Sequence, residues 1–354
     1  MVIKMPKERI LWEMSCSILF LLLVIMVYSF YSYEKGSLAF QVFKIKQEQK
    51  KDEEINQLLN QAAIKKEEEN LEKEKEFTSC INERNDKEEI LEINNEVDSY
   101  IREQKYNVSV YFEDFTTGFN YQYQSNTVYY GCSLIKLVDV LYLINQAING
   151  IIDIDEEKIQ FTKNYYYKDD SGKRTFKLGE GVSLRELMTN AIYISDNSAH
   201  KMLLDYIGFD NLKNYGKSLG AKVILTGGDD FGNQTATDMN LYLKEAYRII
   251  TENKEYGPFL KSIMSGTFYN DFNTEEIKIY HKYGLTGMYY HDVGLYLEEK
   301  PYSIVIMTLH GQRNHKEVIQ NIHLKIRDLQ KKYFEERTTY CYQKVYENKE
   351  DKMN

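Results

Sequence analysis

The chain has 354 residues, of which 43% are hydrophobic and 28% charged, and its mean hydropathy is -0.54. This composition supports a packed core in a largely water-soluble chain, and the length allows one large domain or two smaller ones with additional segments. The net charge of -9 argues against a nucleic acid as the main partner, because phosphate binding requires a basic surface.

An apolar segment stands near the N-terminus. Residues 14–33 contain no charged side chain and consist mainly of Ile, Leu, Val, Phe and Met, and twenty such residues span a bilayer as a helix. Lys4, Lys7 and Arg9 precede the segment, so the positive-inside rule predicts a single-pass protein of the cell membrane. Residues 1–13 are then a cytoplasmic tail, and the rest of the chain is extracellular. The alternative is a cleaved signal peptide, but the segment ends without the small residues that a signal peptidase requires.

A charged stretch follows at residues 34–88. Lys, Glu, Gln and Asn dominate it, and no glycine or proline occurs between Gly36 and Gly118, which favours a helix. Its apolar residues are too sparse for a convincing heptad pattern. We favour a solvated, helical or partly disordered stalk. The alternative is a coiled coil that pairs two copies of the chain.

The cysteines and histidines predict no metal site and no cofactor. No Cys-x-x-Cys motif occurs among the four cysteines, and the six histidines form no His-Glu-x-x-His motif. For Cys80 we favour an unpaired thiol, and the alternative is a cross-link between two copies outside the cell. Cys132 is interpreted as a small packed residue.

A folded domain is predicted at residues 89–338, before a polar C-terminal tail at residues 339–354. Apolar residues first recur at helical spacing, and alternation then predicts two strands around a turn at Thr117–Gly118. An apolar helix follows and ends at Gly150, and Ser183-Leu-Arg-Glu186 forms a capping box that opens another. The helix that this capping box opens covers 183–194. The remaining predicted elements are helices at 199–207 and 316–334 and strands at 277–283, 289–297 and 302–309.

This order of elements predicts an α+β fold. Strands from both ends of the domain must pair into one antiparallel sheet flanked by helices, and the long helical block between them forms an all-helical lobe. The transmembrane helix and the helical stalk precede this domain. A functional site is expected between the sheet and the lobe, where clefts commonly form.

Ser133 and Lys136 are the central candidates for catalysis. They stand three residues apart at the start of the apolar helix, so the lysine amine can reach the serine hydroxyl. A serine hydroxyl needs an adjacent base, and a desolvated lysine with a lowered pKa can serve. The spacing alone is weak evidence, because Ser32/Lys35 and Ser198/Lys201 match it as well, and we interpret those pairs as chance.

Two further motifs support the assignment of Ser133. Ser195-Asp196-Asn197 follows the predicted helix that ends at Ile194, and Lys282-Tyr283-Gly284 lies on a predicted strand. Each has a simpler interpretation, because Ser195 and Asp196 can cap the next helix and Lys282 can be a solvated lysine on an edge strand. The order of the three motifs along the chain favours the catalytic interpretation over the simpler ones.

These motifs resemble those of the penicillin-recognising serine hydrolases, and specifically of the class A β-lactamase-like family. Residues 288–296 also look like this family, and the resemblance covers about residues 89–334. It implies a β-lactamase/transpeptidase-like fold in which Ser133 attacks a carbonyl group and Lys136 accepts or relays its proton. Ser195 is implied to pass a proton toward the leaving nitrogen.

The resemblance also implies a substrate-binding set. Asn197 binds the substrate amide and holds Lys136, and Lys282 adds positive charge near the substrate carboxylate. Tyr283 and Gly284 complete the third motif beside the substrate. The backbone N–H groups of Ser133 and Leu285 form the oxyanion hole.

The sequence departs from this family in two places. The family has Thr or Ser where Tyr283 stands, and that hydroxyl helps to bind the carboxylate, so carboxylate recognition is altered or the pocket is partly blocked. The Glu-x-x-Leu-Asn loop that activates the deacylating water is absent between Asn197 and Lys282. Asp229 or Asp230 is the alternative water-activating group, although this segment is more typical of a turn.

We therefore expect a serine hydrolase that is acylated on Ser133 by an amide or peptide, with a cell-wall peptide of peptidoglycan or a β-lactam-like small molecule as candidate partners. Rapid β-lactamase activity is not expected without the glutamate. The alternative is an inactive or weakly active domain of the same fold that binds or senses cell wall or β-lactams. A plain structural or adhesive role is the third possibility.

Overall fold

The computed structural model describes residues 7–82, 90–104, 107–166, 175–223, 229–267, 271–272, 274, 276–309 and 315–347. It forms two compact units, residues 1–76 and residues 77–354. Some expectations lie outside the described residues: positions 1–6 of the expected cytoplasmic tail, the expected boundary between positions 88 and 89, positions 225–228 of the segment that lacks the glutamate, and positions 348–354 of the expected C-terminal tail.

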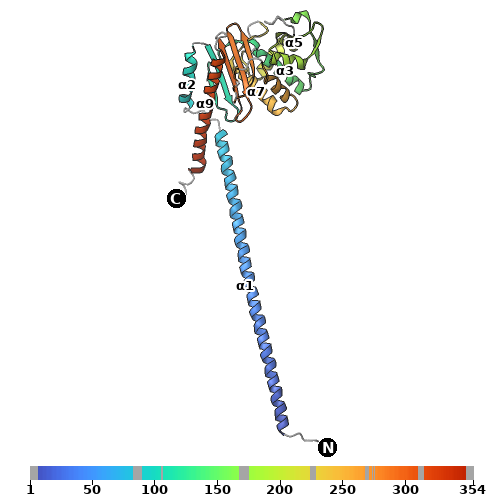
Figure 1. Cartoon of the computed structure of the whole chain (residues 1–354), viewed down its shortest axis with the longest axis vertical. Helices are drawn as coiled ribbons and strands as arrows, with labels where there is room; N and C mark the ends of the chain where they lie inside the picture. Colours follow the sequence, from blue (N-terminus) through green and yellow to red (C-terminus); the bar gives the residue numbers. More distant parts are fainter. Residues whose placement is uncertain are drawn as a thin grey trace. The chain divides into compact units, whose positions relative to one another are not determined.

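The first unit is helical throughout its described part. It belongs to α1, which runs without interruption from Lys7 to Asn82 (Figure 1). This helix contains a stretch that is long and apolar enough to cross a membrane. No protein atoms cover that stretch in the described part of the chain, and the Phe20 side chain is 72% exposed. The N-terminal apolar helix therefore suggests membrane anchoring, whereas pairing of the stalk into a coiled coil stays a prediction.

The second unit is organised around one antiparallel sheet of five strands. The strands are β1 (Asn107–Asp114), β2 (Asn120–Tyr123), β7 (Tyr280–Thr286), β8 (Tyr289–Tyr296) and β9 (Tyr302–Leu309), and their order is β2-β1-β9-β8-β7. β1 pairs with β9 along its full length, from Asn107 opposite Leu309 to Asp114 opposite Tyr302. This pairing confirms the prediction that strands from both ends of the domain share one sheet. In this strand order β7 lies at one edge of the sheet.

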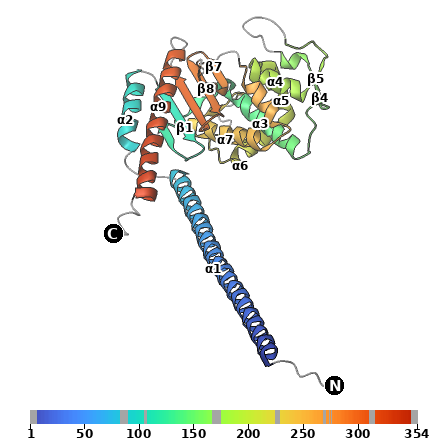
Figure 2. The ribbon, with the colours of Figure 1, turned by 60° about the horizontal axis from the view of Figure 1, so that its bottom comes forward.

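Alternation along the strands gives the sheet two apolar faces. Ile304 and Ile306 of β9 pack with α2 (Ile90–Glu103) and α9 (His315–Tyr342). Val305 and Met307, which alternate with them, pack with the helical lobe. Both views show α2 and α9 on one side of the sheet and the lobe on the other (Figures 1 and 2). Strand periodicity thus buries the sheet on both sides.

The helical lobe carries most of the remaining elements. Its helices are α3 (Ile135–Ile148), α4 (Leu184–Tyr193), α5 (Asn197–Ile207), α6 (Phe209–Ser218), α7 (Ala236–Glu252) and α8 (Gly257–Met264). Short 3-10 turns lie at Cys132–Leu134 (η1) and Lys163–Tyr165 (η2), and short strand pairs join β3 (Tyr129–Tyr130) with β6 (Asn233–Gln234) and β4 (Lys158–Gln160) with β5 (Gly181–Ser183). The predicted cap is present, because the Ser183 hydroxyl accepts a hydrogen bond from the backbone N–H of Glu186 at 3.2 Å.

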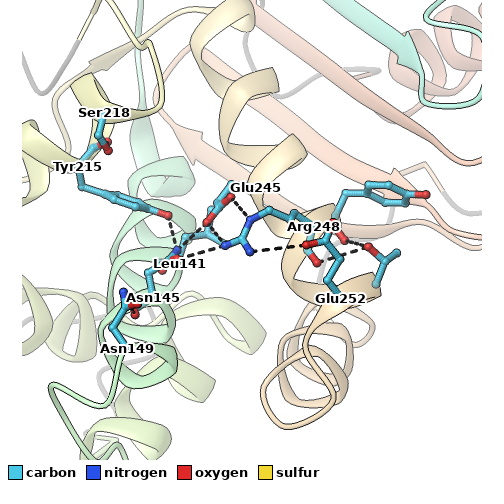
Figure 3. Close-up of polar contacts among 10 residues, drawn as sticks. Leu141, Asn145, Asn149, Tyr215, Ser218, Glu245, Arg248 and Glu252 are labelled. Atoms are coloured by element: carbon cyan, nitrogen blue, oxygen red, sulfur yellow. Dashed lines mark hydrogen bonds and ion pairs between the residues drawn. The ribbon is translucent and has the colours of Figure 1, made fainter.

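A polar network joins three helices of this lobe (Figure 3). The Asn145 side-chain amide on α3 donates to the Tyr215 hydroxyl of α6 at 2.9 Å and to Glu245 of α7 at 2.7 Å. Arg248 donates back to Glu245 at 2.7 Å and to the side-chain amide oxygen Oδ1 of Asn145 at 3.2 Å. Partly buried charges that are paired and fully hydrogen-bonded favour one arrangement of the helices. The network therefore fixes α3, the helix that carries Lys136, within the lobe.

The C-terminal helix differs from the sequence prediction. The predicted helix ends at Phe334, but α9 continues to Tyr342, and a π-helical turn follows at Gln343–Glu347 (η3). The prediction that Cys80 is unpaired is wrong: it forms a disulfide with Cys341, and their Cα atoms lie 5.8 Å apart. The two cysteines are 261 residues apart in sequence, so no local spacing indicates the pair. Only the passage of α9 beside residues 77–82 brings them together.

Candidate functional site

The turn that carries Ser133 is held from both sides. η1 follows β3, and its first residue, Cys132, adopts the left-handed conformation with φ 51°. The His291 ring on β8 lies 2.8 Å from the carbonyl oxygen of Tyr130, and the N–H of Gly131 donates to the carbonyl of Gly232 at 2.8 Å. A non-glycine residue keeps such a conformation only where the surroundings impose it. The surrounding contacts thus fix the backbone conformation of the turn in which Ser133 lies.

Ser133 and Lys136 are in contact, as their spacing predicts. Lys136 is fully buried at the start of α3, and its Nζ donates to the Ser133 Oγ at 3.0 Å. It also donates to the Asn197 Oδ1 at 2.6 Å and to the backbone carbonyl of Ser195 at 2.5 Å. The three acceptors hold the amine against the serine, and Ser133 itself is partly exposed to solvent.

The second motif joins the site through a strained turn between α4 and α5. Ser195 has φ 58°, and its Oγ lies 3.3 Å from the Lys136 Nζ. Asp196 caps α5 by accepting the backbone N–H of Ala199 at 2.6 Å. The expected cap is therefore present at Asp196, and the same turn places Ser195 and Asn197 beside Lys136.

The third motif reaches the same point from the edge strand. Lys282 on β7 is fully buried, so the interpretation of a solvated lysine is wrong. Its Nζ donates to the Ser195 Oγ at 2.9 Å and to the backbone carbonyl of Tyr283 at 2.7 Å. The structure thus brings Ser133, Lys136, Ser195, Asn197 and Lys282 into one hydrogen-bonded group.

Gly284 and Leu285 lie where β7 approaches η1. A Cβ atom added to Gly284 would stand 3.1 Å from the Cys132 Cβ and 3.1 Å from the Gly131 carbonyl oxygen. This close approach favours glycine, because any other side chain would have to displace its neighbours, and it brings the backbone of Leu285 beside the turn that carries Ser133. Tyr283 is buried, and its ring centroid lies 4.2 Å from the Lys282 Nζ.

The two lysines differ from ordinary surface lysines in their protonation. Burial lowers the pKa of Lys136 to about 7, against the opposing effect of the carboxylates of Asp196 and Asp139. Burial and the neighbouring Lys136 hold the pKa of Lys282 well below its usual range. Near neutral pH the amine of Lys136 therefore exists in part as a free base.

Cys132 does not compete with Ser133 as a nucleophile. It is buried, and desolvation raises the pKa of its thiol to about 12, so the thiolate is scarce at neutral pH. This agrees with its interpretation as a small packed residue.

The segment in which the family's glutamate is missing turns sharply next to Lys136. The Asp229 carboxylate accepts the backbone N–H groups of Phe231 at 3.0 Å and Gly232 at 2.8 Å, as in the expected turn, and Asp230 lies 3.5 Å from the Lys201 amine. Both aspartates therefore have structural partners. The ring of Phe231 lies 5.7 Å from the Lys136 Nζ.

Sequence reasoning missed a buried pair behind this site. The His200 Nδ1 lies 2.6 Å from the Asp139 carboxylate, and its Nε2 lies 3.0 Å from the carbonyl oxygen of Asp230. The pair ties α3 and α5 to the segment that carries Phe231. A signal was present, because Asp139 and His200 each stand three residues after Lys136 and Asn197 on their helices.

The fold and this serine–lysine site define the penicillin-recognising class of serine hydrolase folds, and comparisons agree. A sequence model described as the β-lactamase enzyme family matches residues 92–329, so the chain belongs to that family. A search of curated protein sequences gives no match.

Solved structures of the class share the fold. The penicillin-G acyl-enzyme complex of a point mutant of PBP-A has 16% identity and a TM-score of 0.62, over 68% of this chain and 97% of that one. A β-lactamase from Sphaerobacter thermophilus DSM 20745 has 15% identity and a TM-score of 0.59, over 66% and 95%. An ancestral class A β-lactamase has 17% identity and a TM-score of 0.58, over 67% and 99%. The resemblance inferred from the sequence and the expected fold are confirmed.

Proposed function

We propose that the protein is a membrane-anchored serine hydrolase that is acylated on Ser133 by an amide or peptide substrate. The observation that carries this proposal is the contact of 3.0 Å between the Ser133 Oγ and a fully buried lysine amine whose pKa is about 7. A lysine in this state can accept the proton of the serine hydroxyl, which is the activation that a serine nucleophile needs. A domain that only binds its ligand has no use for this pair.

Each residue then has a role in acylation. The Ser133 Oγ forms a bond to the substrate carbonyl carbon while Lys136 takes its proton, and the backbone N–H groups of Ser133 and Leu285 stabilise the oxyanion. The amide C–N bond breaks as Ser195 passes a proton to the leaving nitrogen. This route is supported by the continuous chain of contacts from Lys136 through the Ser195 Oγ to Lys282.

Substrate positioning is assigned to the remaining site residues. Asn197 holds Lys136 through its side-chain oxygen at 2.6 Å, which leaves its amide nitrogen to bind a substrate carbonyl. Gly284 lets β7 approach η1, and Tyr283 forms the wall beside Lys282.

Slow deacylation is part of the proposal. Among the described residues of the turn at 229–232, Asp229 and Asp230 have structural partners, and the ring of Phe231 lies 5.7 Å from the Lys136 Nζ. We propose that hydrolysis of the acyl-enzyme is slow because both aspartates are engaged in structural contacts of this turn. The same observation favours the alternative function, a binding or sensing module whose signal is a long-lived acyl-enzyme or a non-covalent complex with cell wall or a β-lactam.

Location outside the cytoplasm is also proposed. The disulfide between Cys80 and Cys341 supports it, because disulfides persist in oxidising compartments. The basic residues before the apolar helix support the same orientation. A cell-wall peptide is a substrate that a domain in this position would meet.

Covalent labelling tests the proposed function. We expect full-length protein in detergent, incubated with a fluorophosphonate or a fluorescent penicillin, to gain an adduct that peptide mass spectrometry locates on Ser133. Turnover of a chromogenic β-lactam should be slow. Folded protein that gives no adduct with either probe would instead support the binding module, and rapid β-lactam turnover would contradict slow deacylation.

The acylation rate should depend on pH through Lys136. Below a pKa of about 7 the lysine is an ammonium group and cannot accept the serine proton, so we expect the rate of fluorophosphonate labelling to fall about tenfold for each pH unit below 7 and to level off above it. Labelling rates between pH 5 and 9, corrected for probe hydrolysis in buffer, measure the profile. A rate that is flat across this range would exclude Lys136 as the base.

A further inference from the structure

The ammonium group of Lys282 is enclosed by Tyr283 of its own strand and by Ser195. Lys282 is fully buried, and its Nζ donates to the Ser195 Oγ at 2.9 Å and to the Tyr283 carbonyl at 2.7 Å. The Tyr283 ring lies with its centroid 4.2 Å from the same nitrogen, and only 7% of this tyrosine is exposed. An ammonium group has three N–H donors. Two of them are directed at protein oxygens, and an aromatic ring lies over the charge.

This arrangement is unsuited to binding a carboxylate. A carboxylate would need at least one N–H of Lys282 and an open approach to it, but two N–H groups are directed at protein oxygens and the Tyr283 ring lies against the same nitrogen. The favourable contact of a buried ammonium with an aromatic face would be lost if a carboxylate displaced the ring.

Other aromatic rings surround the same region. Tyr130 lies just before Ser133, with its ring centroid 6.4 Å from that of Phe231 and 5.9 Å from that of Tyr289 on β8. Phe231 in turn lies 5.7 Å from the Lys136 Nζ. Each of the two lysine amines thus has one aromatic ring over it, Phe231 for Lys136 and Tyr283 for Lys282, and apolar ring surface of this kind suits an uncharged part of a substrate.

We infer that the site takes an acyl donor whose leaving side carries no carboxylate, such as an internal amide or an ester, and that Tyr283 sets this preference. The inference rests on the proposed acylation of Ser133. A thioester substrate can test this preference. In its reaction the Ser133 Oγ forms an ester bond with the acyl carbon of the thioester, and the C–S bond breaks. The proton from the hydroxyl ends on the thiolate that leaves.

A matched pair of thioesters tests the inference. N-benzoylglycyl thioglycolate carries a carboxylate on its leaving group, and its methyl ester does not. We expect full-length wild-type protein to be acylated faster by the methyl ester, relative to the uncatalysed reactivity of each compound. Tyr283→Thr should shift the ratio of the two rates toward the carboxylate by about tenfold or more, the factor expected for one charge-assisted hydrogen bond. Thiol release and the mass of the protein follow both reactions.

Two variants control the comparison. Tyr280→Thr makes the same change on the same strand, but its ring lies over Lys261 and Lys278, so the ratio should stay at the wild-type value. Tyr283→Phe keeps the ring and should also keep the wild-type ratio. A wild-type preference for the carboxylate, or a ratio that Tyr283→Thr leaves unchanged, would overturn the inference. Absence of a Ser133 adduct with both thioesters and with the fluorophosphonate would instead refute the proposed function on which it rests.

Discussion

Replacing Lys136 with methionine should slow fluorophosphonate labelling of Ser133 by about 10²–10⁴-fold, the usual contribution of a positioned general base. Methionine is unbranched, has sulfur in place of the δ-methylene group and lacks the amine, so it fills this fully buried position without a base. Ser133→Ala should abolish the adduct, because the attacking oxygen is gone. Time courses of labelling, read by intact-protein mass spectrometry, measure both effects.

The chain provides its own control for this prediction. Ser198 and Lys201 have the same spacing as Ser133 and Lys136 but lie on α5, where Lys201 pairs with Asp205 and Asp230, each at 3.5 Å. Ser198→Ala and Lys201→Met should therefore label at the wild-type rate. Near-UV circular dichroism must show that Lys136→Met is folded, because the variant removes the donor to the partly buried Ser195 carbonyl and Asn197 Oδ1. Equal labelling of folded Lys136→Met and wild type would remove the lysine from the mechanism.

Much of this site could be predicted from the sequence because its residues come as short motifs. A separation of three residues on a helix brings Ser133 and Lys136 together whatever the rest of the chain does. Ser195 and Lys282 could be added only through a family resemblance, since their approach to Lys136 depends on tertiary structure. The sequence could not decide how Tyr283 lies. Its ring covers Lys282 because β7 is an edge strand that runs directly against η1.

The fold was predictable for a similar reason. Alternation with a period of two identified the strands at both ends of the domain, and the two faces of the sheet each need a helical cover. The end of α9 was not predictable, because the stretch after Phe334 is polar. Its buried residues Arg337, Cys341 and Val345 pack where residues 77–82 pass, and this contact joins segments about 260 residues apart.

The pairing of Cys80 with Cys341 shows the limit of composition. The four cysteines show no spacing motif that predicts a set of disulfide bonds. A single pair of distant cysteines leaves no pattern in the sequence. The structure surrounds the pair with other contacts: Arg337 of α9 donates to the carbonyl oxygen of Ile81 at 2.8 Å and also to that of Cys80. The C-terminal helix is thereby fastened to the segment that leads into the domain.

Removing this disulfide should cost the second unit much of its stability. The bond closes a loop of about 260 residues, and loss of a native disulfide typically lowers the free energy of unfolding by about 2–5 kcal/mol. We therefore expect Cys341→Ser and Cys80→Ser to unfold at lower denaturant concentration than wild type, and wild type treated with a reductant to match them. Cys16→Ser alters an exposed cysteine and should leave the transition unchanged. Equal transitions for all four proteins would mean that α9 and residues 77–82 hold together through their hydrogen bonds and packing alone.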